Sequence, residues 1–225
     1  MSYAPAGGLI FTQKFVATLL SYDRQAPPVM GRGLEAKKVA FAALMGALGN
    51  SLFAISQSLQ LVSGGQVALD LSHVATFISA LYGGPLLGFL VGALVGLGPG
   101  LYFGSVAGAI GLYLPMMVLG KSLTGLTAGL LSRALMRRGP TPRRALLIVP
   151  VSFLPECFII VVFFTVMLPW LSPILPVVLV KAWVEIAFMA FLMGALAGNK
   201  GFSDLMKKFL VINQGFLGSL RSQNS

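Results

Sequence analysis

The distribution of basic residues constrains this fold more than any other feature of the sequence. Of the sixteen Lys and Arg residues, fourteen fall into three clusters that are separated by long apolar stretches. Loops of membrane proteins that face the cytoplasm are enriched in Lys and Arg, so the clusters predict both a membrane protein and its orientation. The clusters are Lys14, Arg24, Arg32, Lys37 and Lys38; Arg133, Arg137, Arg138, Arg143 and Arg144; and Lys200, Lys207, Lys208 and Arg221.

The composition agrees with an integral membrane protein. Apolar residues make up 56% of the 225 residues and charged residues only 10%, whereas soluble domains carry about 25% charged residues. A net charge of +10 would suggest nucleic acid as the partner of a soluble protein. Here the positive charges flank apolar segments, so we expect a lipid bilayer and no nucleic acid. The sequence therefore predicts a multi-pass protein of the cell membrane.

Three membrane spans follow directly from the apolar segments. A spanning helix needs about 20 predominantly apolar residues. Residues 39–55, 146–168 and 174–197 satisfy this requirement and are bounded by basic or proline-rich segments.

The segment of residues 67–131 would hold either two long spans or three shorter ones. The first two basic clusters should lie on the same side of the membrane, so an even number of spans must separate them. Three spans in this segment, together with residues 39–55, meet that condition. Gly83-Gly84-Pro85 and residues 98–104 supply the turns that three spans require.

The predicted fold is an all-α membrane protein, a bundle of six transmembrane helices with both termini in the cytoplasm. Its three outer loops, residues 57–66, 98–105 and 169–173, contain no Lys or Arg.

We divide the chain into a cytoplasmic or interfacial segment (residues 1–35), a six-helix domain (residues 36–199) and a cytoplasmic tail (residues 200–225). The apolar segment of residues 9–22 is too short to span the membrane, and its pattern predicts a helix on the inner surface. The pattern of residues 205–217 predicts another such helix. For both stretches a partly ordered tail is the alternative.

Small residues recur at a spacing that brings helices together. The glycines of the third predicted helix form a bare stripe up to the expected break at Pro99, where a neighbouring backbone can approach closely. Ala43 and Ala47 form a comparable face near the cytoplasmic end of the first helix. That face would dock either within the bundle or against a separate membrane subunit. The repeating glycines are Gly84, Gly88, Gly92, Gly96, Gly100, Gly104 and Gly108, followed by Gly125 and Gly129 in the fourth helix.

Four charged residues, Lys121, Glu156, Lys181 and Glu185, lie inside predicted spans. Each would cost about 2.5–3.5 kcal/mol at the bilayer centre, so all four should face the protein interior. They would form either an ion network that fixes helix register or a polar substrate pocket, and a pocket can be built from such a network.

Several neighbouring residues complete the candidate site. His73 is expected either to face a pocket that opens outward or to pack in the core, and Asp70 is expected to cap the helix that begins beside it. Tyr113 and Trp183 are placed to line a cavity.

Catalysis and metal binding are not expected. Gly120-Lys121-Ser122 resembles the end of a phosphate-binding loop, but Pro115 occupies the position of the first glycine. With one cysteine, Cys157, and one histidine, we expect no cysteine-rich or zinc site, no cofactor and no enzymatic activity.

Residues 35–198 resemble the substrate-binding S component of an energy-coupling-factor (ECF) vitamin transporter. Residues 1–30 have no counterpart in that family. The matching elements are Lys37-Lys38 before Ala43 and Ala47; Leu69-Asp70-Leu71-Ser72-His73; Gly83-Gly84-Pro85 with Gly88; Lys121 with Gly125, Ala128 and Gly129; and Lys181 with Glu185.

The resemblance implies a high-affinity binding subunit that captures a vitamin or vitamin precursor from outside. A transmembrane T component, contacted by Ala43 and Ala47, and two cytoplasmic ATPases would drive import, and residues 57–66 would form a lid. The alternatives are a self-sufficient small transporter or channel and an intramembrane enzyme.

Overall fold

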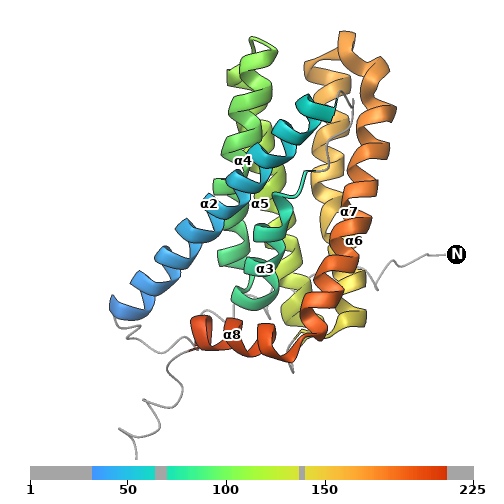
Figure 1. The fold of residues 1–225 in the computed structure, drawn as a ribbon. Coiled ribbons are helices and arrows are strands. Elements are labelled where there is room, and N and C mark those ends of the chain that lie inside the picture. Colours follow the sequence, from blue (N-terminus) through green and yellow to red (C-terminus); the bar gives the residue numbers. More distant parts are fainter. Residues whose placement is uncertain (1–31, 64–69, 137–139, 212–225) are drawn as a thin grey trace, which may run out of the picture. The chain divides into compact units, whose positions relative to one another are not determined.

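The computed structural model describes residues 32–63, 70–136 and 140–211 (Figure 1). The chain divides into two compact units, Met1–Ala36 and Lys37–Ser225. Of the first unit, the structure describes only residues 32–36, which form the start of a helix. The predicted surface helix of residues 9–22 lies outside the described residues.

The described part of the second unit is helical, with short connecting turns. A π-helical turn, η1, extends α6, and a 3-10 helix, η2, precedes α7. The elements are α2 (Arg32–Ser63), α3 (His73–Gly83), α4 (Pro85–Val106), α5 (Ile110–Leu135), α6 (Pro142–Val162), η1 (Phe163–Met167), η2 (Pro169–Ile174), α7 (Leu175–Gly198) and α8 (Lys200–Val211).

Five helical segments in the described residues are long and apolar enough to cross a membrane. Their outward faces carry large apolar side chains, among them Leu90, Leu119, Leu154 and Phe191. A helical, multi-pass membrane protein is therefore confirmed at this level. The segments are Ala36–Leu59, Pro85–Val106, Ile110–Leu135, Pro142–Met167 and Pro169–Gly198.

The second of the six predicted spans is a helix, but it is too short to cross a membrane. Helix α3 has 11 residues, which at about 1.5 Å per residue covers roughly half of a hydrocarbon core about 30 Å thick. The helix begins at His73, directly after Asp70 and Ser72, whose polar side chains find partners inside the bundle. The count of six spanning helices is thus not confirmed.

The turn predicted at Gly83-Gly84-Pro85 is present. Helix α3 ends at Gly83, Gly84 has φ of +87°, and Pro85 begins α4. A left-handed backbone suits glycine because it has no Cβ, and proline fits the first turn of a helix because its missing N–H is not needed there.

The break predicted within residues 98–104 is wrong, because α4 continues through Pro99 to Val106. The chain turns later, at residues 107–109, where Gly108 has φ of +64°. The predicted outer loop of residues 57–66 also begins too early, since α2 extends to Ser63; residues 64–66 lie outside the described part. The third outer turn coincides with η2.

Asn50 of α2 forms hydrogen bonds with the α4 backbone directly before Pro99, where α4 continues without a break. The Asn50 Nδ2 amide donates to the Leu94 carbonyl at 2.9 Å, and Asn50 Oδ1 accepts from the Gly98 N–H at 2.9 Å. The side chain therefore stands in for the helical bond between these two backbone groups, next to the N–H that Pro99 lacks.

The glycine stripe packs α4 against α5, as its spacing predicts. A methyl group added at Gly88, Gly92 or Gly96 would overlap the α5 backbone at Gly125, Lys121 and Met117 respectively. Because Pro99 does not end the helix, the stripe continues beyond it: Gly100 and Gly104 lie against Leu114 and Ile110.

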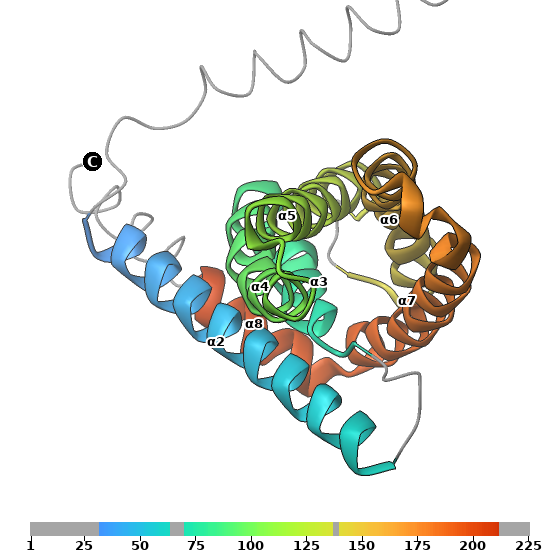
Figure 2. The same cartoon turned by 90° about the horizontal axis from the view of Figure 1, so that it is seen from above.

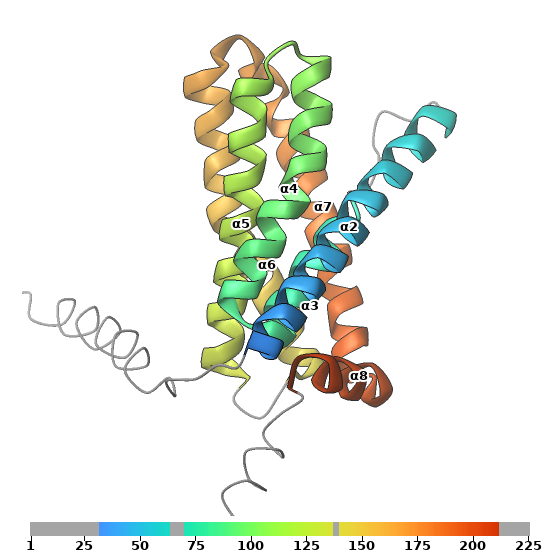
Figure 3. The same cartoon turned by 90° about the vertical axis from the view of Figure 1, so that its left-hand side faces the viewer.

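The core lies around α3, with α4, α5 and α7 packed against it (Figure 2). Nearly every described α3 side chain is buried, including Phe77 and Thr76. Helix α2 runs at a steep angle to the others (Figure 3).

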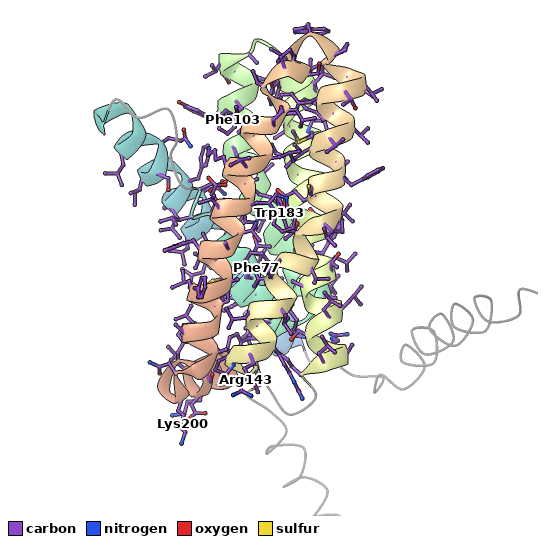
Figure 4. All side chains as sticks on the ribbon, turned by 90° about the vertical axis from the view of Figure 1, so that its right-hand side faces the viewer. Phe77, Phe103, Arg143, Trp183 and Lys200 are labelled. Atoms are coloured by element: carbon purple, nitrogen blue, oxygen red, sulfur yellow. The ribbon has the colours of Figure 1, made fainter. Side chains whose placement is uncertain are left out.

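The described basic clusters gather at one end of the unit, which we call the basic end. Lys38 lies near the start of α2, and Arg143 and Lys200 lie together in Figure 4. Residues 98–120 and 157–180, which include the turns at the opposite end, contain no charged residue.

Helix α8 lies at the basic end and is amphipathic. Ser203 and Met206 are buried, while Leu205 and Phe209 are about half exposed. The Ser203 hydroxyl is 3.0 Å from the Tyr82 hydroxyl of α3. The predicted interfacial helix of residues 205–217 thus begins earlier, and residues 212–217 lie outside the described part.

Candidate ligand-binding cavity

A cavity of about 300 Å³ occupies the half of the bundle that lies away from the basic end. Its lining residues run from Tyr113 to Lys121 on α5 and from Phe153 on α6 to Phe164 in η1. On α7 they reach Ile186, and Ile174 of η2 brings the cavity to the far end. The size is at the lower limit of small-molecule sites. Most of the wall is apolar or aromatic, including Phe53, Pro99, Phe103, Met116, Met117, Ile160 and Val178.

Lys121 anchors the floor of the cavity. Its ammonium nitrogen lies 3.1 Å from Asp70 Oδ2 and 2.9 Å from the Ser72 hydroxyl. Lys121 is only 1% exposed, so its charge depends on these partners. The short α3 makes this pairing possible, because the chain enters the bundle at Asp70 and Ser72, at the depth that Lys121 reaches on α5.

Glu156 is held by two neighbours. Its Oε2 accepts from the Thr124 hydroxyl at 2.6 Å, and its Oε1 lies 3.5 Å from His73 Nε2. The imidazole itself stacks on Phe77 with ring centroids 5.8 Å apart. Both carboxylate oxygens of Glu156 are thereby positioned at the cavity wall.

Glu185 ties α7 to the start of α3. Its Oε1 accepts from the Asp70 backbone N–H at 2.8 Å. Lys181, one helical turn away, approaches the same oxygen at 3.7 Å, and its side chain is 27% exposed. Backbone N–H groups at the start of a helix lack helical partners, and Glu185 satisfies one just before α3.

The structure brings six of the seven predicted site residues together around the cavity. These are His73, Tyr113, Lys121, Glu156, Lys181 and Glu185.

Trp183 is the predicted site residue that does not line the cavity. It is 38% exposed, and its ring packs edge-on against Phe153 at 5.6 Å (Figure 4). The ion network and the pocket, which the sequence left as alternatives, occupy the same place.

Four polar members of the site, Gln57, Asp70, Ser72 and Thr124, were not among the predicted site residues. Asp70 was expected to cap a helix, but Ser72 occupies the N-cap of α3; Asp70 Oδ1 accepts from the Ser72 N–H at 2.9 Å, and its Oδ2 pairs with Lys121. Ser72 and Thr124 carry hydroxyls that are common in any helix. Only Asp70 could have been recognised from the sequence as a site residue, because it is a third acidic residue among apolar ones.

The predicted docking face on α2 is accessible in this unit. Ala43 and Ala47 are exposed, and Leu44 and Leu48 beside them are 56% and 39% exposed. A face of small residues flanked by leucines permits close approach of another helix.

Comparisons with protein-family models, curated proteins and solved structures found no match to this chain. In the described residues, no three His, Cys, Asp or Glu side chains converge as metal ligands. The geometry of the cavity therefore carries the functional argument.

Proposed function

We propose that this protein is the membrane-embedded binding subunit of an ATP-driven importer of the ECF type, and that it captures a vitamin or vitamin precursor from outside the cell. The observation that carries this proposal is the cavity, which combines apolar walls with the buried polar cluster of Asp70, His73, Lys121, Glu156 and Glu185. Such sites bury most of a small ligand and orient it with a few polar groups.

The shape of the interior favours a binding protein over a channel. The cavity ends at His73, and beyond it α3 fills the bundle with buried side chains such as Phe77, Ile78 and Leu81. The cavity lining does not extend to these side chains, so delivery of a ligand requires a change in conformation or a partner.

The proposed partners are a transmembrane T component and two cytoplasmic ATPases. The exposed Ala43 and Ala47 face supports a helical partner, and the sequence contains no nucleotide-binding loop of its own. Under the positive-inside rule the basic end faces the cytoplasm, so the cavity faces outward.

Ligand retention without transport tests the proposal. The protein should be purified in detergent, and small molecules released on denaturation identified by mass spectrometry. We expect one compound in a near-equimolar amount. In liposomes that contain this chain alone, that compound should bind without net uptake, whereas uptake by the chain alone would establish the self-sufficient transporter instead.

The docking face is tested separately by enlarging one alanine. Ala43→Phe should abolish co-purification of the membrane partner while ligand retention persists. Ala187→Phe, at an exposed alanine of α7, is the matched control and should leave the partner bound. Equal loss in both variants would show that the α2 face has no special part in assembly.

A further inference from the structure

Acidic residues concentrate in the cavity, although the whole chain is strongly basic. The chain has six Asp and Glu residues and a net charge of +10. Three of those six, Asp70, Glu156 and Glu185, line the cavity, together with only two of the sixteen Lys and Arg residues, Lys121 and Lys181. The site therefore has a charge composition opposite to that of the protein.

His73 lines the same cavity and is counted as neutral here, as it is in the net charge of the chain. Its Nε2 lies 3.5 Å from Glu156 Oε1. Its Nδ1 is buried and has no hydrogen-bond partner among the described residues, and the side chain is 4% exposed.

The cavity therefore carries a formal excess of one negative charge. Three carboxylates face two ammonium groups, and residues 64–69, which lie outside the described part, include no charged residue. The N-terminus of α3 points toward this cluster and offsets about half a charge, which leaves the site negative. Buried charge without a counter-charge is costly, so a ligand that supplies a positive charge is favoured.

We propose that the ligand carries a cationic nitrogen group, held between Glu156 and Glu185, on a body that the aromatic wall surrounds. This inference rests on the proposed function and specifies the class of its ligand. The two glutamates come from facing helices and line the same cavity. Tyr113 and Phe164 belong to the same lining and supply aromatic rings, whose faces attract cations.

An organic cation fits this site better than a metal ion. No three metal-binding side chains converge in the described part of the chain. A cavity of about 300 Å³ with mainly apolar walls would also leave a bare ion without most of its oxygen ligands.

A matched series of probes and variants tests this charge preference. Benzamidine, benzamide and benzoate have nearly the same shape and carry one positive, no and one negative charge. Their dissociation constants should be measured by ligand-observed NMR on purified protein, freed of co-purified ligand, in the same micelles. The variants are Glu185→Gln, which brings the formal charge to zero and can still accept the Asp70 N–H, and Lys181→Met, which brings it to minus two.

We expect the wild-type protein to bind benzamidine about tenfold more tightly than benzamide, as for a hydrogen bond to a charged group. Glu185→Gln should remove most of that preference, and Lys181→Met should widen it. The proposal would be overturned if benzoate bound more tightly than benzamidine, if the three probes bound equally, or if none of them bound. It would also be overturned if the preference were unchanged in both variants.

Failure of this inference is distinguishable from failure of the proposed function. A retained equimolar ligand that is neutral or anionic would leave the binding subunit in place and refute the cation. Uptake by the chain alone would refute the binding subunit, whatever the charge of its cargo.

Discussion

Two lysines within one cavity illustrate how environment decides the role of a residue. Lys121 is fully enclosed and bonded to Asp70 and Ser72, so it belongs to the framework that holds the start of α3. Lys181 is partly exposed, and its nearest carboxylate oxygen, on Glu185, lies at 3.7 Å. From the sequence alone, both lysines have the same expected cost of burying a charge in the membrane, so their roles could not be distinguished.

The two lysines should therefore differ in their effect on stability. Lys121→Met should lower the free energy of unfolding by about 3–5 kcal/mol, because it leaves the Asp70 carboxylate buried and unpaired. Lys181→Met, the matched control, should cost less than about 1 kcal/mol, as expected for a loose and partly exposed pair. Unfolding of both variants in the same micelles measures the difference, and equal losses would contradict the assigned roles.

At the scale of residues, the sequence identified the charges but not their partners. Lys121, Glu156, Lys181 and Glu185 were predictable because each is costly in a membrane. Asp70 was assigned to a helix cap, because the depth of a residue depends on where its helix starts. Of the aromatic wall only Tyr113 was predicted, since Phe103 and Phe164 have the same periodicity as core residues.

At the scale of elements, the contact between α4 and α5 positions the site. Gly92 lies against the backbone of Lys121 itself, so the closeness of the two helices sets where the ammonium group reaches. Glycine spacing predicted this contact. The continuation of α4 through Pro99 was not predictable, because it depends on Asn50, which is 49 residues earlier in the chain.

Adding one methyl group should separate these helices. Gly92→Ala is expected to destabilise the protein by about 1–3 kcal/mol, because its Cβ would overlap the Lys121 carbonyl oxygen and the backbone must shift. Gly111→Ala, on α5 with nothing within 4 Å, should be neutral or gain up to about 1 kcal/mol from helix propensity. Melting temperatures of the two variants provide the test; comparable losses would argue against close packing at Gly92.

At the scale of the whole molecule, orientation follows from the basic end. The positive-inside rule predicts that Arg143 lies in the cytoplasm and that the turn at residues 107–109 lies outside. This assignment does not depend on whether α3 is counted as a span, because α3 returns the chain from the cavity floor to the basic end (Figure 1).

Cysteine labelling of intact cells tests this orientation. Cys157 is the only cysteine, so single cysteines can be placed in a Cys157→Ala background. A membrane-impermeant maleimide should label Ala107→Cys from outside but Arg143→Cys only after permeabilisation. The reverse pattern would invert the molecule and place the cavity toward the cytoplasm.

The half-length α3 also determines where the membrane voltage falls. Where water fills the cavity, the outer potential extends to its floor, and the field is concentrated across the roughly 16 Å that α3 covers. A cation would then enter the cavity with little electrical work. Nearly all of the favourable electrical free energy, about 2.3 kcal/mol per 100 mV, would come when the cation is released to the cytoplasm. Retention of benzamidine in liposomes should accordingly change little with an imposed potential, and a steep dependence would place the voltage drop above the floor.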